Sequence, residues 1–378
     1  MDLSNITIII PTYNRSAYLH RNLTFWKDSK IQMIVADGSS LSQPAEKLSE
    51  FSNLAYFYEE TSLQARLKRA IDHVVTDFAI ICGDDELMLP SALSMMRAFL
   101  IENEDFTACI GRCIAVTKTE CGRQSVAFLE PDKVGQVHHQ VNQNSSSDRV
   151  NYHFSNYAVS TFYGLHRRKS LQAISKFSFR PEIESVFVTE NLFELASAVV
   201  GKSAVLDFPS WLRSSENKPI RRKNKDISIH EWMPENKIFY ENIVSQLTND
   251  ILRIDPSRYL KEQSLQGVIL NAPLLIKFSS STPTQRIKIF IVNLEKKLFY
   301  TFIWKIWLTL FRILVAVLNN RVPRTKLAVF FGRSYFLNSS RLSFQRLEMS
   351  EISIENCKDL VPTLNFLLSY QIRSGANH

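Results

Sequence analysis

The sequence predicts an α/β fold in which buried strands of a mostly parallel sheet alternate with helices. Three continuous apolar runs, residues 6–10, 31–36 and 78–82, carry this prediction. Runs of this length and character are typical of strands that are covered on both faces. Polar residues follow each run, and ligands of open α/β sheets bind beyond the carboxyl ends of the strands. We therefore expect one ligand site where these three runs end.

The expected elements follow one another in a β-α-β order. Pro11 stops the first strand, and a helical pattern occupies residues 17–27. The second strand ends at Asp37-Gly38-Ser39-Ser40, a sequence typical of a turn. The later elements are a strand at 54–58, a helix at 63–75, the strand at 78–82, a polar loop at 137–148, strand and helix signals at 160–166 and 192–200, and helices from about residue 231 onward.

The length of 378 residues predicts one larger domain with an appendage. Apolar residues make up 45% of the chain and charged residues 22%, values close to the globular average, which excludes extensive disorder. The first residues show no leader pattern, and the five cysteines lack a disulfide-like spacing. We therefore expect a cytoplasmic protein with structural thiols.

The formal net charge of +8 predicts an anionic partner. Nucleic acid, nucleotide phosphates and an anionic membrane surface all qualify. No DNA- or RNA-binding motif occurs, and Lys and Arg concentrate in the C-terminal half near apolar and aromatic stretches. Phosphate or a membrane surface is therefore favoured over nucleic acid.

Three consecutive carboxylates follow the strand expected at 78–82. These residues, Asp84, Asp85 and Glu86, are called the acidic cluster below. Adjacent carboxylates repel one another unless a cation or solvent lies between them. This favours a role in metal or phosphate binding. The alternative is a solvated acidic turn before the helix that Pro90 would begin.

The run Ile8-Ile9-Ile10-Pro11-Thr12-Tyr13-Asn14-Arg15 resembles the opening motif of glycosyltransferase family 2, a large family of inverting enzymes that use nucleotide sugars. Three later motifs resemble that family in the same order. They are Asp37-Gly38-Ser39 at the end of the second strand, Ala65-Arg66 in the following helix, and Cys82-Gly83-Asp84-Asp85-Glu86-Leu87-Met88-Leu89-Pro90.

The resemblance implies a GT-A-type catalytic domain over residues 1–230 and a mainly α-helical region over residues 231–378. It also implies a donor-binding set whose members are Pro11, Thr12, Tyr13, Arg15, Asp37, Arg66 and Asp84. Within this set Thr12 and Tyr13 would line the nucleotide pocket. Asp37 would accept a hydrogen bond from the base or ribose, and Arg66 would hold the diphosphate. The structural alternatives are loop packing for Tyr13, turn formation for Asp37 and a solvated helix position for Arg66.

Two positions depart from the pattern of the family. Gly83 stands where the first aspartate of the family's Asp-x-Asp motif is expected, so Asp85 is assigned to a divalent metal, Mn²⁺ or Mg²⁺, and Asp84 to the sugar or ribose. Asn191 stands where the base aspartate is common, and an amide cannot accept a proton at neutral pH. Glu190 is therefore the expected catalytic base. The alternative is that Glu190 merely stabilises the first turn of a helix.

Residues 297–320 form an apolar and aromatic stretch whose polar residues fall on one narrow stripe, which predicts an amphipathic helix. Lys305 and Arg312 would lie near the middle of a membrane span, so a place in the membrane interface is favoured. The alternative is a buried helix or a dimer interface. The basic run at 218–225 is expected to be a solvated loop or a lipid contact rather than a loop over the diphosphate.

The combined expectation is an inverting transferase that moves a sugar from a nucleotide donor, for example a UDP-sugar, to a glycan or lipid-linked acceptor. Cell-surface polysaccharide assembly at the cytoplasmic face of the membrane would fit this activity. Two alternatives remain open. A nucleotidyltransferase would also use carboxylates at strand ends, but it would normally contain a Gly-rich phosphate loop, which this sequence lacks. A non-catalytic family member is suggested by Gly83 and Asn191.

Overall fold

The computed structural model describes residues 2–121, 124–131, 139–157, 161–214, 227–254, 265–276, 335–338 and 358–369. Residues 1–276 and 336–378 form one compact unit, and residues 277–335 form a second. The described residues, except Tyr335, belong to the first unit. The boundary expected near residue 230 stays a prediction.

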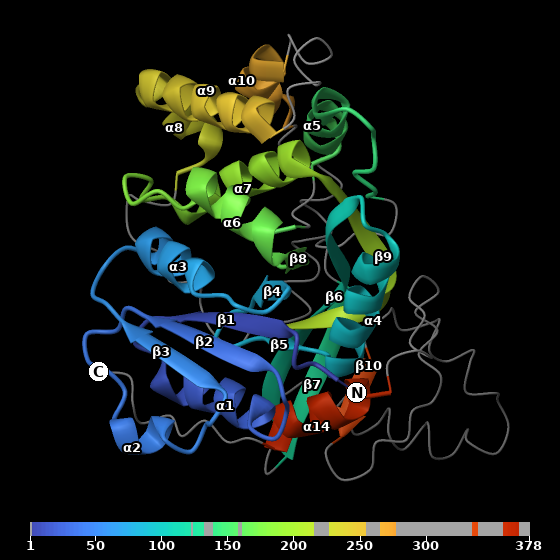
Figure 1. The fold of residues 1–378 in the computed structure, drawn as a ribbon. Helices are drawn as coiled ribbons and strands as arrows, with labels where there is room; N and C mark the ends of the chain where they lie inside the picture. The colour runs from blue at the N-terminus through green and yellow to red at the C-terminus, as the bar shows by residue number, and fades with distance from the viewer. Residues whose placement is uncertain are drawn as a thin grey trace, which may run out of the picture. The chain divides into compact units, whose positions relative to one another are not determined.

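One half of the sheet is parallel and contains the strands predicted from the sequence (Figure 1). Its order is β3-β2-β1-β4, and every neighbouring pair within it is parallel. The strands are β1 (Ile6–Thr12), β2 (Gln32–Asp37), β3 (Leu54–Tyr58) and β4 (Phe78–Ile81). The β1–β2 register places Thr12 beside Asp37, so the ends of both strands reach the same edge of the sheet.

The other half of the sheet is mixed, and its long strands were not predicted. β8 lies antiparallel between β4 and β6, and β6 also pairs with β7 and β9. β9 pairs in turn with β5, which directly follows the acidic cluster. The strands are β5 (Leu87–Met88), β6 (Phe106–Cys121), β7 (Gln124–Pro131), β8 (Leu165–Arg167), β9 (Lys202–Ser214) and β10 (Tyr335–Asn338).

Helices cover both faces of the parallel strands because side chains alternate along each strand. Ile9 packs in the same core as α3, whereas Ile8 and Ile10 pack in the same core as α1. Figure 1 shows α3 and α1 on opposite sides of these strands. The helices that flank the sheet are α1 (Ser16–Trp26), α2 (Ala45–Leu48), α3 (Leu63–Asp72), α4 (Pro90–Glu102), α6 (Arg168–Ser178) and α7 (Val186–Val200).

The helical character predicted from about residue 231 onward is confirmed for α8 (Ile229–Glu235), which begins two residues earlier, and for α9 (Lys237–Ile254) and α10 (Leu265–Leu275). Their apolar side chains join the core that α3, α6 and α7 also share. The amphipathic stretch at 297–320 and the basic run at 218–225 lie outside the described residues. None of the helices that the structure describes is long and apolar enough to span a membrane.

The loop predicted over residues 137–148 is wrong in its last part. α5 (Ser146–Ser155) begins inside the serine-rich stretch. The hydroxyl of Ser145 accepts a hydrogen bond of 3.0 Å from the backbone N–H of Asp148, which caps the helix. Ser and Asp are preferred at helix starts as well as in loops, so composition alone could not distinguish the two.

Described cysteines behave as the expected structural thiols. Cys82, Cys109 and Cys113 are fully buried thiols in one apolar core. Burial raises the pKa of the Cys82 and Cys109 thiols well above the usual range. These thiols are therefore protonated and unreactive at neutral pH.

A distant C-terminal helix supports the segment behind the acidic cluster. α14 (Leu360–Ser369) shares a small apolar core with β5 and the start of α4. Asp359, just before α14, accepts hydrogen bonds from the backbone N–H and the hydroxyl of Ser91 in the first turn of α4. α4 has no side-chain cap of its own, so Asp359 supplies one from 268 residues away.

Candidate active site

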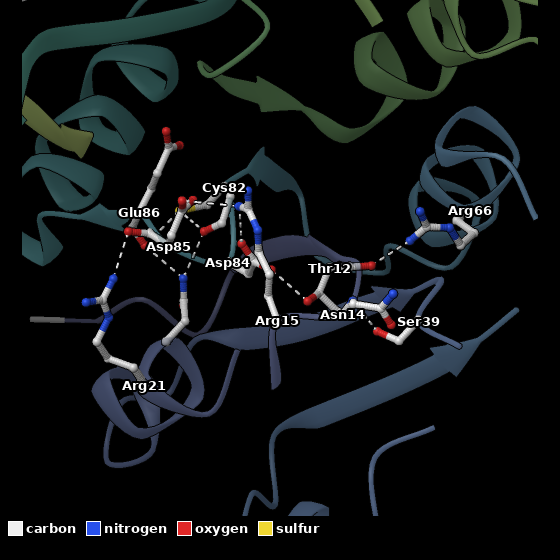
Figure 2. Close-up of polar contacts among 12 residues, drawn as sticks. Thr12, Asn14, Arg15, Arg21, Ser39, Arg66, Cys82, Asp84, Asp85 and Glu86 are labelled. Carbon is white, nitrogen blue, oxygen red and sulfur yellow. Dashed lines mark hydrogen bonds and ion pairs between the residues drawn. The ribbon is translucent and has the colours of Figure 1, made fainter. Parts of the chain in front are cut away.

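The ends of two adjacent strands bring the first site residues together (Figure 2). The hydroxyl of Thr12, which ends β1, donates a hydrogen bond of 2.7 Å to Asp84 Oδ2, which follows β4. The chain runs outward from β1 to β2 and β3 and then returns to β4, so the direction of chain order reverses between β1 and β4. Open α/β sheets bind ligands at such a point.

Residues on either side of Thr12 have different surroundings. Pro11 lies within β1 beside Ala36 of β2. The prediction that Pro11 stops the strand is wrong, because β1 continues for two residues beyond Ile10, to Thr12. Tyr13 follows the strand and leaves 37% of its side chain exposed. An exposed aromatic face at the carboxyl edge of the sheet is suited to stacking on a flat ligand.

Arg15 contacts two members of the acidic cluster. Its Nη1 atom lies 3.3 Å from Asp84 Oδ1 and 3.2 Å from Asp85 Oδ2. The preceding residue, Asn14, has a left-handed φ of 53°. Asn14 is held there because its backbone N–H donates to the Ser39 hydroxyl and its side-chain oxygen accepts from the backbone N–H of Ser40. The loop after β2 thus sets the backbone position of Arg15.

Asp37 is fully buried and takes part in the scaffold of the site. Its Oδ1 accepts a hydrogen bond of 2.8 Å from the backbone N–H of Ser39, and its Oδ2 accepts one of 2.7 Å from the Tyr56 hydroxyl. The turn role weighed for Asp37 is therefore present in the structure. A contact between Asp37 and a nucleotide stays a prediction. Each carboxylate oxygen can accept a second hydrogen bond, which such a contact would use.

Arg66 joins the ends of the first two strands. Its Nη1 donates to the backbone oxygen of Thr12 at 2.9 Å and to that of Ala36 at 2.6 Å. The side chain is buried, so the alternative of a solvated helix position is wrong. A buried guanidinium needs acceptors for its N–H groups. The two backbone carbonyls supply them, which explains how the Arg66 side chain can be buried. A direct contact between Arg66 and a diphosphate stays a prediction.

Gly38→Ala is expected to lower the free energy of unfolding by about 1–3 kcal/mol, the range typical of overpacking, and to weaken nucleotide binding. A Cβ atom on Gly38 would lie 2.3 Å from Arg66 Cζ. The guanidinium would have to move and break its bonds to both strands. Gly267→Ala is the matched control, because a Cβ atom there meets nothing within 4 Å. Urea unfolding of both variants checks the prediction, and equal stability would contradict it.

α1 positions the backbone of the acidic cluster. Arg21 Nη2 donates to the backbone oxygen of Asp85 at 2.9 Å. The amide of Asn22 donates to the backbone oxygens of Gly83 and Glu86, at 3.1 and 2.8 Å. Both side chains are fully buried. The carboxylates are therefore held on a rigid turn rather than on a free loop.

The acidic cluster contains carboxylates with strongly shifted protonation. Burial raises the pKa of Asp84 to about 7, and the charge of Asp85 adds to this shift, while Arg15 and Thr12 oppose it. Burial, with Asp85 again adding, raises the pKa of Glu86 to about 8. Burial is the main cause of both shifts, because it disfavours the charged form of a carboxyl group.

The predicted base, Glu190, lies in the first turns of α7. The hydroxyl of Tyr163 donates a hydrogen bond of 3.1 Å to Glu190 Oε1. Burial raises the pKa of Glu190 to about 7, and the bond from Tyr163 opposes the shift. A general base is most effective when its pKa lies near the working pH.

Two aromatic residues that sequence reasoning missed connect Glu190 with the acidic cluster. The rings of Tyr163 and Trp211 stack with centroids 4.2 Å apart. Trp211 Nε1 donates a hydrogen bond of 3.0 Å to Glu86 Oε2, while Tyr163 bonds Glu190. Arg213, two residues along β9, opposes the rise that burial causes in the pKa of both carboxyl groups. No local motif marks these residues, because the β5–β9 pairing that places Trp211 is non-local.

Glu194, one turn after Glu190 on α7, fixes the turn that carries Tyr163. Its carboxylate accepts hydrogen bonds from the backbone N–H groups of Thr161 and Phe162, at 2.8 and 2.9 Å, and from the Thr161 hydroxyl. His153 Nε2 lies 3.2 Å away. Burial acts to raise the pKa of Glu194, but these partners outweigh it and the pKa is lowered. Glu194 is thus a charged anchor.

Asn191 and Thr189 flank Glu190 but serve α7 and its packing. The Asn191 amide donates to the backbone oxygen of Phe187 at 2.8 Å. The Thr189 hydroxyl accepts a hydrogen bond of 3.0 Å from Gln64 of α3. The last bond ties α7 to the helix that also carries Arg66.

Tyr163→Phe is expected to move the acidic limb of the pH–rate profile upward by about one pH unit, given about 1.5 kcal/mol for a hydrogen bond to a charged group. The hydroxyl stabilises ionised Glu190, so its removal raises the pKa of the carboxyl group. The ring retained in Phe preserves the stacking on Trp211. The pH dependence of kcat checks the prediction, and an unchanged or downward-shifted limb would contradict it.

Asp84 and Asp85 suit a hard divalent cation. Mg²⁺ is usually bound by one or two carboxylates together with substrate phosphates, so two converging carboxylates are a sufficient protein contribution. Among the described residues there is no group of three or more His, Cys, Asp or Glu side chains suited to hold a metal without such help.

Comparison with known proteins supports the expected resemblance. The sequence pattern of Glycosyl transferase family 2 matches residues 7–173. Through this segment, the chain is similar to glycosyltransferase family 2. The matched segment contains Thr12, Asp37, Arg66 and the acidic cluster, but it ends before Glu190. The match supports the expected enzyme class, a glycosyltransferase. No curated protein sequence matches the chain.

One solved structure agrees with the expected GT-A-type fold. S. aureus TarS 1-349 in complex with UDP-GlcNAc has a TM-score of 0.50 and 16% identity, over 74% of this chain and 73% of that chain. S. aureus TarS has a TM-score of 0.49 and 16% identity, over 75% of this chain and 45% of that chain. The chain thus spans less than half the length of that TarS chain. At this identity the likeness to the complex concerns the fold, which confirms the predicted α/β class.

Proposed function

We propose that this chain is a glycosyltransferase of family 2 that moves a sugar from a UDP-sugar to a glycan or lipid-linked acceptor with inversion at the anomeric carbon. The observation that carries the proposal is the meeting of Thr12, Arg15, Asp84 and Asp85 at the carboxyl ends of β1 and β4. UDP-GlcNAc in the similarly folded TarS 1-349 supports the choice of uridine nucleotide.

The donor site is proposed at the loops after β1 and β2. Tyr13 offers an exposed ring to the base, and Asp37 lies behind the loop that would face the ribose. Arg66 acts by holding the two loops together, since its Nη1 atom bonds both strand ends. Asp84 is proposed to contact the sugar or ribose, and Arg15 the diphosphate, whose oxygens suit a guanidinium.

The cation proposed for this site is Mn²⁺ or Mg²⁺, held by Asp85 with Asp84 beside it. When bound, such a cation neutralises the charge that develops on the leaving diphosphate. The chain itself supplies the remaining groups. Asn22 and Arg21 keep the carboxylates in place through the backbone of the acidic cluster.

Glu190 is the proposed base that takes the proton from the acceptor hydroxyl. A pKa of about 7 suits that task, because the group is partly ionised at neutral pH and still binds a proton firmly. Tyr163 orients the Glu190 carboxylate through its hydrogen bond. Trp211 stacks on Tyr163 and donates to Glu86, so the two rings link Glu190 to the acidic cluster. Attack from the face opposite the leaving group gives inversion.

A membrane-linked acceptor is proposed from the net charge of +8 and the amphipathic stretch at 297–320. In that setting the protein would be peripheral on the cytoplasmic face of the membrane. Truncation before Lys297 is then expected to release the protein from membranes. Sedimentation with anionic vesicles measures this, and binding that persists in the truncated protein would place the contact elsewhere.

A thermal-shift screen with UDP-, GDP- and CMP-linked sugars in the presence of Mn²⁺ tests the donor assignment. A ligand that binds the native state alone raises stability by about 2.7 kcal/mol at a hundredfold excess over Kd. UDP-sugars are expected to give the largest rise in Tm. A larger rise with a GDP- or CMP-sugar would reassign the donor, and no rise with any would contradict donor binding.

A further inference from the structure

We propose that Arg15 makes cation binding at the acidic cluster conditional on a nucleotide diphosphate. The inference rests on the proposed function, since it concerns the cation site of the same reaction. Arg15 Nη1 lies 3.3 Å from Asp84 Oδ1 and 3.2 Å from Asp85 Oδ2, between the two carboxylates (Figure 2). A divalent cation that contacts both carboxylates needs the place that the guanidinium occupies.

The contacts of Arg15 with these carboxylates are loose enough for Arg15 to leave them for another partner. Both distances exceed the roughly 2.7–2.9 Å of strong charge-assisted hydrogen bonds. The Arg15 side chain is 19% exposed, compared with 5% for Asp84, so the guanidinium has a route towards solvent. Its backbone is fixed because Asn14 is bonded to Ser39. The side chain can therefore change partners while its point of attachment stays in place.

Arg15 and a divalent cation would compete for the same carboxylate oxygens, Asp84 Oδ1 and Asp85 Oδ2. With Arg15 still between the carboxylates, the two cations would also repel each other at close range.

A diphosphate removes this conflict. The forked donors of a guanidinium match phosphate oxygens, so a nucleotide diphosphate at the ends of β1 and β4 gives Arg15 a new partner. The two carboxylates are then free to bind the cation, whose charge the diphosphate also shares. Metal and nucleotide should therefore bind cooperatively, and each should raise the affinity of the other by the same factor.

Mn²⁺ binding, followed by the electron paramagnetic resonance signal of the free ion, tests this with and without UDP. Arg15→Gln is expected to bind Mn²⁺ alone about tenfold more tightly than the wild type, within the usual range of coupling between sites. UDP should then improve Mn²⁺ binding less than it does in the wild type. Arg15→Lys keeps the charge and should resemble the wild type. Arg180→Gln is the control, because Arg180 bonds Gln246 outside the site.

Other outcomes separate the inference from the proposed function. If Arg15→Gln binds Mn²⁺ alone no more tightly than the wild type, while UDP still promotes Mn²⁺ binding in both, Arg15 does not compete and the inference is overturned. The donor site then stands. If UDP fails to promote Mn²⁺ binding in the wild type, the inference and the metal-dependent donor site fail together. Thermal unfolding without ligands shows that each variant is folded.

Discussion

Asp85→Asn is expected to lower the rate of glycosyl transfer by roughly 100- to 1,000-fold. A cation that polarises a leaving group supplies several kcal/mol, and each 1.4 kcal/mol or so is a factor of ten in rate. Asn keeps the shape of Asp but loses the charge that holds the cation. The backbone oxygen at this position, which Arg21 holds, is unchanged. Steady-state assays at several Mn²⁺ concentrations measure the loss.

Asp72→Asn is the matched control for the loss of one carboxylate. Asp72 forms an exposed ion pair with Lys68 on α3. Exposed pairs of this kind contribute little to stability, so activity should be unchanged. The Asp85 variant should also need more Mn²⁺ to reach half of its residual rate. Full activity with the wild-type dependence on Mn²⁺ would contradict the metal assignment.

Glu190→Gln is expected to lower kcat by about 100- to 10,000-fold, the usual contribution of a general base. Donor binding should persist, because the carboxyl group faces Tyr163 rather than the strand ends. In the wild type, kcat should rise with pH through about 7, since Glu190 must lose its proton to act as base. In the variant this limb should disappear. Stopped-time assays from pH 5.5 to 8.5, roughly 1.5 units on either side of the pKa of Glu190, follow both effects.

Asn191→Asp tests the neighbouring position, where the family commonly has its base. The amide of Asn191 is bonded within α7 to the backbone oxygen of Phe187, which does not place it as a base. Placed in the Glu190→Gln background, an aspartate at 191 should therefore not restore activity. Recovery of much of the wild-type kcat would move the base to position 191. Wild-type activity in Glu190→Gln itself would remove Glu190 from the mechanism.

The parallel half of the sheet was predictable because its strands are covered on both faces. Their runs are predominantly apolar, and β1 and β2 end at Thr12 and Asp37, within two residues of those runs. The family motifs lie at these same ends. A shared site at these strand ends was expected, and the β1–β4 pairing, which was not predicted, brings Thr12 to Asp84.

The other half of the sheet and the surroundings of Glu190 depend on contacts that local patterns do not encode. β9 reaches the acidic cluster by pairing with a strand of two residues, too short to give a periodic signal. Tyr163 and Trp211 therefore carry no motif. Arg66 and Asp37 show a second limit. Their residue types suggested ligand contacts, whereas backbone bonds account for much of their burial.

Product analysis with a UDP-sugar labelled in the sugar tests the proposed glycosyl transfer. Purified protein, Mn²⁺ and an acceptor fraction containing glycans and lipid-linked glycans are incubated with the donor. We expect that label enters the acceptor, that UDP is released in equal amount, and that the new linkage has the inverted anomeric configuration. Release of pyrophosphate, or donor binding without transfer of label to any acceptor, would contradict it.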